Sequence, residues 1–108
     1  MKIGKVIGNV VATRKDERLV GYKLLVVKIL YPTKDGELKE RESYYEDSYC
    51  VAVDLVDAGV GELVLLCSGS SARVSAAREV PVPVDEAIVG IIDNVDIYVV
   101  DREEGRCA

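Results

Sequence analysis

Five short apolar runs separated by turn-forming residues are the feature that most constrains how this chain folds. Each run is rich in valine, isoleucine or leucine, and none shows the 3.6-residue periodicity of a long amphipathic helix. The runs span residues 3–13, 22–31, 49–56, 62–67 and 88–101. The chain is therefore predicted to be all-β.

A barrel is the expected arrangement of these strands, because closure limits the exposed edges of a small sheet. We predict a small five-stranded OB-like β-barrel with one or two short helical turns, and a small sandwich is the alternative. Gly4 and Gly8 lie inside the first run, where glycine marks a bulge, a barrel corner or a close backbone approach. Residues 1–101 are expected to form a single domain, followed by a polar tail at 102–108.

Several local features refine this prediction. Ser70 or Ser71 is expected to cap a short helix, and Asp85 to cap another helical turn. A kink is expected in the last run at Gly90 or near residues 93–94. The polar segment 32–48 contains an Asp35-Gly36 turn dipeptide and is interpreted as a solvated loop or frayed ribbon.

The composition argues against several classes of function. The chain has no histidine, which removes the commonest general base and metal ligand. Its three cysteines, Cys50, Cys67 and Cys107, include no C-x-x-C pair, which argues against a disulfide scaffold or a structural zinc site. The net charge of −5 disfavours a nucleic-acid partner. No apolar run is long enough to span a membrane, and no signal peptide is visible, so a cytoplasmic protein without cofactors is expected.

The loop that ends the fourth run, "CSGSSAR", allows three interpretations. A phosphate-binding loop would need a lysine and a long helix after it, and neither is present. A nucleophilic serine would need the G-x-S-x-G elbow and a histidine. The small residues of the loop are compatible with the third interpretation, which is close packing of protein backbones. An enzyme is therefore not expected.

Two other groups of residues are candidate sites. The carboxylates could suggest acid–base or cation chemistry, but they lie at turns or kinks, where aspartate commonly binds local amides. The tyrosines could stack on bases, but acidic residues surround them, which makes nucleic-acid binding unlikely. The carboxylates are Asp54, Asp57, Glu62, Asp93 and Asp96, and the tyrosines are Tyr44, Tyr45 and Tyr49.

Glycines beside apolar strands, with no tryptophan or phenylalanine in the chain, predict a barrel that exposes flat aliphatic surface. Such surface is usually covered by another subunit, so a homo-oligomer is expected.

Four stretches, in this order, give the chain a recognisable pattern. They are "GKVIGNVVATRKDERLVGYKLLVV" (4–27), "VAVDLVDAGVGELVLL" (51–66), "GSSAR" (69–73) and "PVDEAIVGIIDNVDI" (83–97). Together they resemble the EutN/CcmL family of bacterial microcompartment vertex proteins. Asp57 departs from the family pattern, in which glycine is frequent, and the segment 32–48 falls where the family varies in length.

The resemblance implies a structural protein. Family members are OB-like barrels that form homopentamers and cap the five-fold vertices of shells whose facets are hexameric proteins. The expected location is thus the microcompartment shell in the cytoplasm, and the expected partners are further copies of this chain and hexameric shell proteins. The type of compartment is left open. The alternative function is an OB-type module that binds a small ligand or single-stranded nucleic acid.

The same resemblance suggests a role for the loop. Five copies leave little room at a ring axis, which suits Gly69, Ser70 and Ser71. Arg73 is expected to make a hydrogen bond or ion pair across the subunit boundary, because a planar guanidinium fixes register well.

Overall fold

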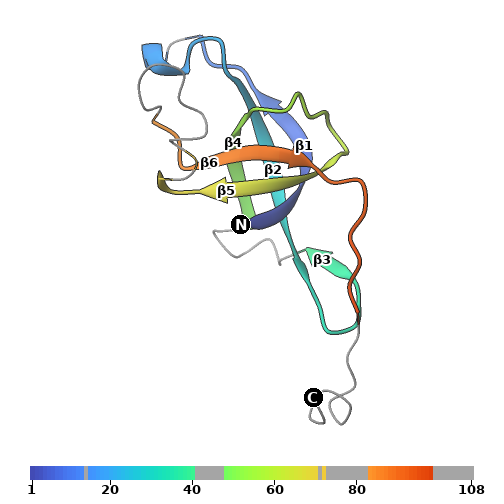
Figure 1. The fold of residues 1–108 in the computed structure, drawn as a ribbon. Coiled ribbons are helices and arrows are strands. Elements are labelled where there is room, and N and C mark those ends of the chain that lie inside the picture. The colour runs from blue at the N-terminus through green and yellow to red at the C-terminus, as the bar shows by residue number, and fades with distance from the viewer. Residues whose placement is uncertain (14, 41–47, 71, 73–82, 99–108) are drawn as a thin grey trace.

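The computed structural model of the chain describes residues 1–13, 15–40, 48–70, 72 and 83–98, and strands dominate it (Figure 1). The boundary expected between a domain ending at residue 101 and a tail lies outside these residues. The elements are β1 (Lys2–Val10), η1 (Glu17–Leu19), β2 (Lys23–Pro32), β3 (Leu38–Glu40), β4 (Tyr49–Asp54), β5 (Leu63–Ser68) and β6 (Glu86–Ile91).

The strands close into a barrel. Neighbours follow the order β1-β5-β6-β4-β2, and antiparallel pairing of β1 with β2 joins the two ends of this series. The β4–β6 pairing is parallel and short, with Val53 opposite Ala87 and Asp54 opposite Ile88. β3 is outside the barrel, and among the described strands it pairs only with the end of β2. The predicted five-stranded barrel is therefore confirmed.

Aliphatic side chains fill the barrel. Gly4 lets β1 pass close to β2, because a Cβ at this position would overlap the Val27 side chain. Gly8 follows a bulge, since Val6 pairs with Val27 but Gly8 pairs with Val26, which leaves Ile7 as the extra residue. Both glycines thus have the roles that the sequence predicted. The buried residues of this core are Val6, Leu25, Val27, Ala52, Ala58, Val64, Leu66 and Ile88.

A second cluster lies on the outside of the barrel. Its buried members come from β4, β5, β6 and the segment after β5, and they are Val53, Cys67, Ala72 and Ala87. Leu19 of η1 and the nearby Tyr22 pack against this cluster. The Asp16 carboxylate accepts a hydrogen bond from the Arg18 amide at 2.9 Å, which caps η1. Cys67, a buried member of this second cluster, is a core residue.

Three local predictions differ from the structure. No helical turn follows Asp85, because β6 begins at the next residue. The last strand ends at Ile91 rather than continuing to residue 101. In the polar segment the predicted Asp35-Gly36 turn is present, since Gly36 has a φ of 84° and its amide donates to the Thr33 carbonyl at 3.1 Å, but it joins β2 to β3 in a hairpin rather than a loop.

Two other predictions are met in part. β6 carries an irregularity close to the expected kink, since Leu65 pairs with Gly90 but Leu66 pairs with Ile88. Ser70 and Ala72 have helical conformation, and the other residues of the predicted short helix lie outside the described ranges. Among the helices of the described residues, none is long and apolar enough to cross a bilayer.

Candidate assembly surfaces

The loop after β5 is exposed at one end of the barrel. Gly69 has a φ of +66°, a left-handed conformation that favours glycine, and a Cβ there would meet no atom within 4 Å. Its amide donates to the Asp85 carbonyl at 2.9 Å, which ties the loop to the start of β6. Ser70 is exposed. Ser71 and Arg73 lie outside the described residues, so the structure describes Gly69 and Ser70 of the predicted axial loop but not the predicted boundary residue.

The carboxylate of Asp54 has a structural role. It accepts hydrogen bonds from the amides of Val56 and Ala58, at 3.1 and 2.9 Å, and lies 3.4 Å from Lys23 Nζ. These bonds satisfy it inside the turn that follows β4, as the sequence predicted. Among the described residues, no group of three or more potential ligands is placed to hold a metal ion.

Lys28 and Tyr49 contact each other on the outer face of the sheet. Lys28 Nζ donates to the Tyr49 hydroxyl at 3.0 Å, lies 4.8 Å from the centre of that ring, and forms an ion pair with Glu40 at 3.0 Å. These contacts raise the pKa of Lys28, the bond from Tyr49 contributing most. Tyr49 is thus engaged within the sheet, and Tyr44 and Tyr45 lie outside the described residues.

Cys50 lies near the barrel mouth, where Lys2 and Glu86 form an ion pair at 3.0 Å. Burial, and secondarily the negative charge of Glu86, raise the pKa of the Cys50 thiol to about 11. The thiol is therefore protonated at neutral pH, which is unsuitable for a nucleophile.

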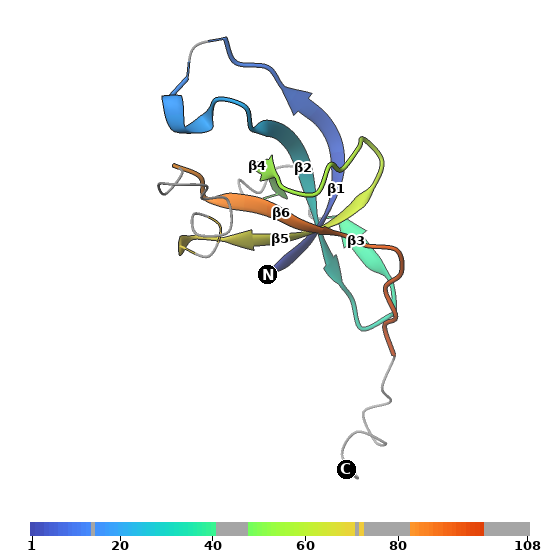
Figure 2. The ribbon, with the colours of Figure 1, turned by 45° about the horizontal axis from the view of Figure 1, so that its top comes forward.

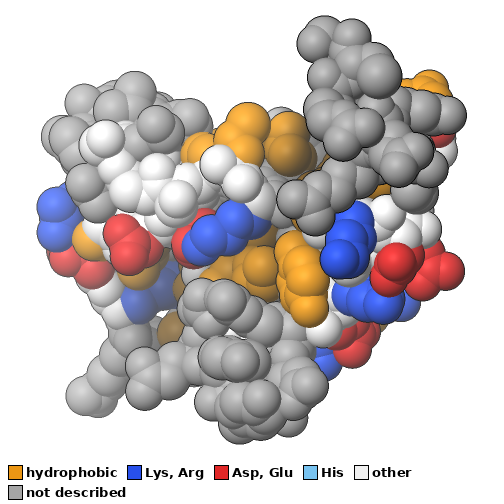
Figure 3. Space-filling view, turned by 90° about the horizontal axis from the view of Figure 1, so that it is seen from below, with side chains coloured by type: hydrophobic (Ala, Val, Ile, Leu, Met, Phe, Trp, Pro, Cys, Tyr) orange, Lys and Arg blue, Asp and Glu red, His pale blue; other side chains and the backbone are white. Residues whose placement is uncertain are grey.

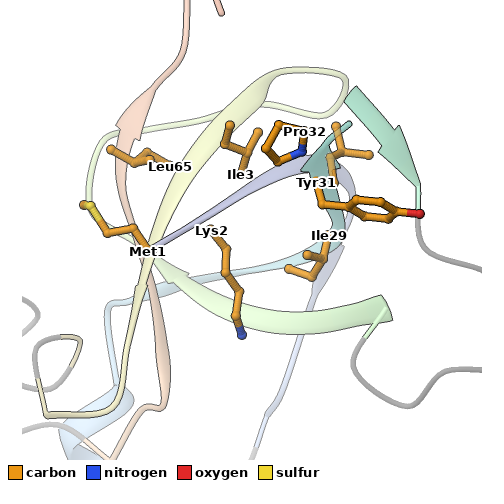
Figure 4. Close-up of a pocket in the computed structure, with 8 residues that line it drawn as sticks. Met1, Lys2, Ile3, Ile29, Tyr31, Pro32 and Leu65 are labelled. Atoms are coloured by element: carbon orange, nitrogen blue, oxygen red, sulfur yellow. The ribbon is translucent and has the colours of Figure 1, made fainter. Parts of the chain in front are cut away.

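An apolar groove of about 390 Å³ opens beside the start of β1 (Figure 4). It forms because β2 continues to Pro32, beyond the point where Ile3 of β1 pairs with Leu30. Ile3 also pairs with Leu65 of β5, so three strands present one apolar row. The lining residues are Met1, Lys2, Ile3, Ile29, Leu30, Tyr31, Pro32 and Leu65.

Hydrophobic side chains gather around a hollow at the centre of the face seen from below, with charged side chains on both sides (Figure 3). Sequence reasoning predicted exposed aliphatic surface but did not locate this groove. A usable signal was the run "KLLVVKILYP", which is apolar on both faces of the strand, as expected of a strand with one face in the core and the other against a partner.

Comparisons with known proteins give a consistent result over most of the chain. The model of the family described as "Ethanolamine utilisation protein EutN/carboxysome" matches residues 1–93. The bacterial microcompartment shell vertex protein GrpN of Rhodospirillum rubrum (strain F11) is 46% identical over 96 residues, covering 89% of this chain and 97% of that protein. The vertex protein PduN of Salmonella typhimurium (strain LT2) is 45% identical over 97 residues, covering 88% and 98%.

Solved structures agree with these relatives. A GrpN pentameric microcompartment shell protein from Rhodospirillum rubrum superposes with a TM-score of 0.69 at 44% identity, covering 90% of this chain and all of that one. The CcmL structure from Gloeobacter violaceus gives a TM-score of 0.70 at 36% identity, with 92% of each chain covered.

Proposed function

The chain belongs to the EutN/CcmL family, and on that premise we propose that five copies form a ring that fills a five-fold vertex of a bacterial microcompartment shell. The observation that carries this proposal is the near full-length similarity to vertex proteins, in sequence and in fold. The role is structural rather than enzymatic.

The function of such a ring is geometric. A flat layer of hexagonal tiles cannot close into a polyhedron without five-fold points, so pentamers supply the closure. Hexameric shell proteins are the expected neighbours of the ring. A heterologous contact, in which each subunit presents two different surfaces, closes into a ring when the rotation between neighbours is right.

The loop Gly69–Ser71 is our candidate for the lining of the ring axis. The open space around Gly69 and the exposure of Ser70 support this placement, because neighbouring copies could approach there without a clash. Arg73 is our candidate for a contact across the subunit boundary. The role of Arg73 rests on the family and on the residue type.

Dilution of an Arg73→Ala variant tests the boundary role. We expect its pentamer to dissociate at protomer concentrations at least tenfold higher than the parent, measured by mass photometry or sedimentation velocity. The matched control is Arg18→Ala, because Arg18 bonds Asp16 within its own chain at 3.0 Å. Equal stability of the two variant rings would remove Arg73 from the boundary.

Native mass spectrometry tests the function itself. A pentamer is expected, and a monomer that binds an oligonucleotide at low salt would instead favour the binding-module alternative. Coexpression with a hexameric shell protein should then give closed assemblies by electron microscopy, whereas omission of this chain should leave open-ended ones.

A further inference from the structure

A strand-like arm follows the barrel and has no strand partner in the described structure. We define the arm as residues 92–98, "IDNVDIY". The Ile92 amide donates to the Leu63 carbonyl at 2.8 Å, but residues 93–98 make no backbone hydrogen bond with any other described residue. Val95 and Ile97 alternate with Asp96, which is typical of a strand with one apolar face, and Tyr98 is 83% exposed.

The apolar groove has the complementary character. Ile3, Leu30 and Leu65 form a row across three strands, and Pro32 extends it along β2. In Figure 4 Leu65, Ile3 and Pro32 lie around an open space together with Met1, Ile29 and Tyr31, and the Lys2 side chain points away from it. The groove volume of about 390 Å³ leaves room for aliphatic side chains from an extended segment.

The arm of the same chain leads away from its own groove. β6 pairs Gly90 with Leu65 and Ile91 with Val64, and Ile92 then bonds Leu63, so residues 90–92 run along β5 away from Leu65, which lines the groove. In Figures 1 and 2 the N-terminus lies on one side of the β2–β3 hairpin and the arm runs along the other side. An arm could therefore reach this groove more readily from a second copy.

The charges of the arm and of the groove are also complementary. Asp93 and Asp96 are exposed on the arm, while Lys2 lines the groove and Lys5 is the next outward residue of β1. Lys5 lies directly opposite Lys28, a like-charge pair that disfavours the isolated sheet. Lys5 has no ion-pair partner among the described residues, so an acidic segment beside it would be stabilising.

We propose that the arm of one copy docks in the apolar groove of the next copy. This contact is heterologous, because the donor and the acceptor surfaces lie on opposite sides of the hairpin, and it can therefore propagate around a ring. The proposal rests on the proposed pentamer and assigns its contact surfaces. Apolar residues of the arm enter the groove, and its aspartates face Lys2 and Lys5.

Disulfide trapping tests the contact directly. In a Cys107→Ser background, Ile97→Cys combined with Ile3→Cys should give, on mild oxidation, a ladder of covalent oligomers up to the pentamer on a non-reducing gel. Ile97→Cys combined with Val20→Cys is the matched control, because Val20 is 60% exposed and outside the groove. A parent pentamer whose Ile97/Ile3 variant gives no more oligomer than the control would overturn the proposal.

A second pair of variants covers the case in which the cysteines disturb folding. Val95→Asp with Ile97→Asp should raise the dissociation constant of the ring at least tenfold, while the far-ultraviolet circular dichroism of the barrel is retained. Val20→Asp should leave the ring unchanged. An arm variant as tightly assembled as the parent would contradict the docking. A monomeric parent would instead contradict both this contact and the proposed function, which separates the two failures.

Discussion

Gly4 occupies a position where the barrel has no room for a side chain. A Cβ added there would overlap the Val27 side chain and approach the Lys28 carbonyl oxygen to 3.1 Å, and backbone cannot move away easily. We expect Gly4→Ala to lower the free energy of unfolding by about 2 kcal/mol, which is typical of an overpacked core. Urea denaturation at a fixed protomer concentration measures this change.

Gly8→Ala is the matched control, because the atoms nearest to a Cβ there are 3.9 Å away, at ordinary contact distance. Its free energy of unfolding should stay within about 1 kcal/mol of the parent, with stabilisation as the expected direction, since alanine restricts the unfolded chain. Equal losses for the two variants would show that crowding at Gly4 is not the cause.

Asp57 stands where the family pattern frequently has glycine, and its φ of 59° explains that preference. Aspartate tolerates the left-handed region better than most residues, whereas a β-branched residue does not. We expect Asp57→Gly to match or exceed the parent in thermal stability and Asp57→Val to lose about 1–2 kcal/mol. A scan of thermal unfolding compares the three proteins, and equal stability of the glycine and valine variants would refute the role of φ.

Cys50 should react slowly with alkylating reagents, because its thiol pKa is raised to about 11 by burial and by Glu86. At pH 8 we expect modification by iodoacetamide to be roughly 100-fold slower than for an exposed thiol. The folded protein favours the protonated thiol of Cys50, so the contribution of this group to the free energy of unfolding is fully present below the ordinary thiol pKa. That contribution is lost as the pH rises through about 11. Peptide mapping across pH would locate the inflection, and a midpoint near 8.5 would be inconsistent with this environment.

The turn between β4 and β5 depends on one carboxylate. The Asp54 side chain is 1% exposed, and it binds two backbone amides as well as Lys23. Asp54→Ala would leave these donors unsatisfied, so we expect a loss of about 3 kcal/mol. The control is Asp57→Asn, which removes a 97% exposed partner of the same lysine and should cost under about 1 kcal/mol. Similar urea midpoints for the two variants would show that the buried hydrogen bonds contribute little.

The strands of the barrel were predictable because their signals are local. Runs such as residues 22–31 and 62–67 carry their own strand pattern, and Gly4 and Gly8 indicated a close approach and a bulge before any pairing was known. The turn role of Asp54 followed from its position beside the turn that ends an apolar run. Such features depend on a few neighbouring residues, so one sequence is enough to recognise them.

The features that were missed depend on distant pairings. Residues 92–98 have the composition of a strand, but beyond the Ile92 amide they form no backbone hydrogen bond with any strand of the described residues. β3 is a partial exception, because the Asp35-Gly36 turn was predicted and only the pairing of the charged segment with the end of β2 was not. The groove arises because β2 extends beyond the residues that pair with β1. This difference in extent follows from the strand register, which the sequence pattern does not encode.

At the scale of the whole molecule, the fold places the three candidate contact surfaces on different parts of the barrel. The axial loop candidate follows β5, the arm follows β6, and the groove lies beside the start of β1. Since β5 and β6 are antiparallel, the loop and the arm leave the barrel at opposite ends of that pair. One small barrel can therefore place one end toward a ring axis and use other surfaces for its neighbours.

Substitution of Ser70 by tryptophan tests the axial placement. Five indole rings would crowd an axis lined by this loop, so we expect Ser70→Trp to shift the population from pentamers to smaller species at protomer concentrations where the parent ring is intact. The control is Val60→Trp, because Val60 is 68% exposed in the turn that precedes β5, at the other end of that strand. Retained circular dichroism would show that both barrels are folded. If native mass spectrometry then finds the two variants equally pentameric, the loop lies away from the axis, and the small residues there serve the left-handed turn at Gly69 alone.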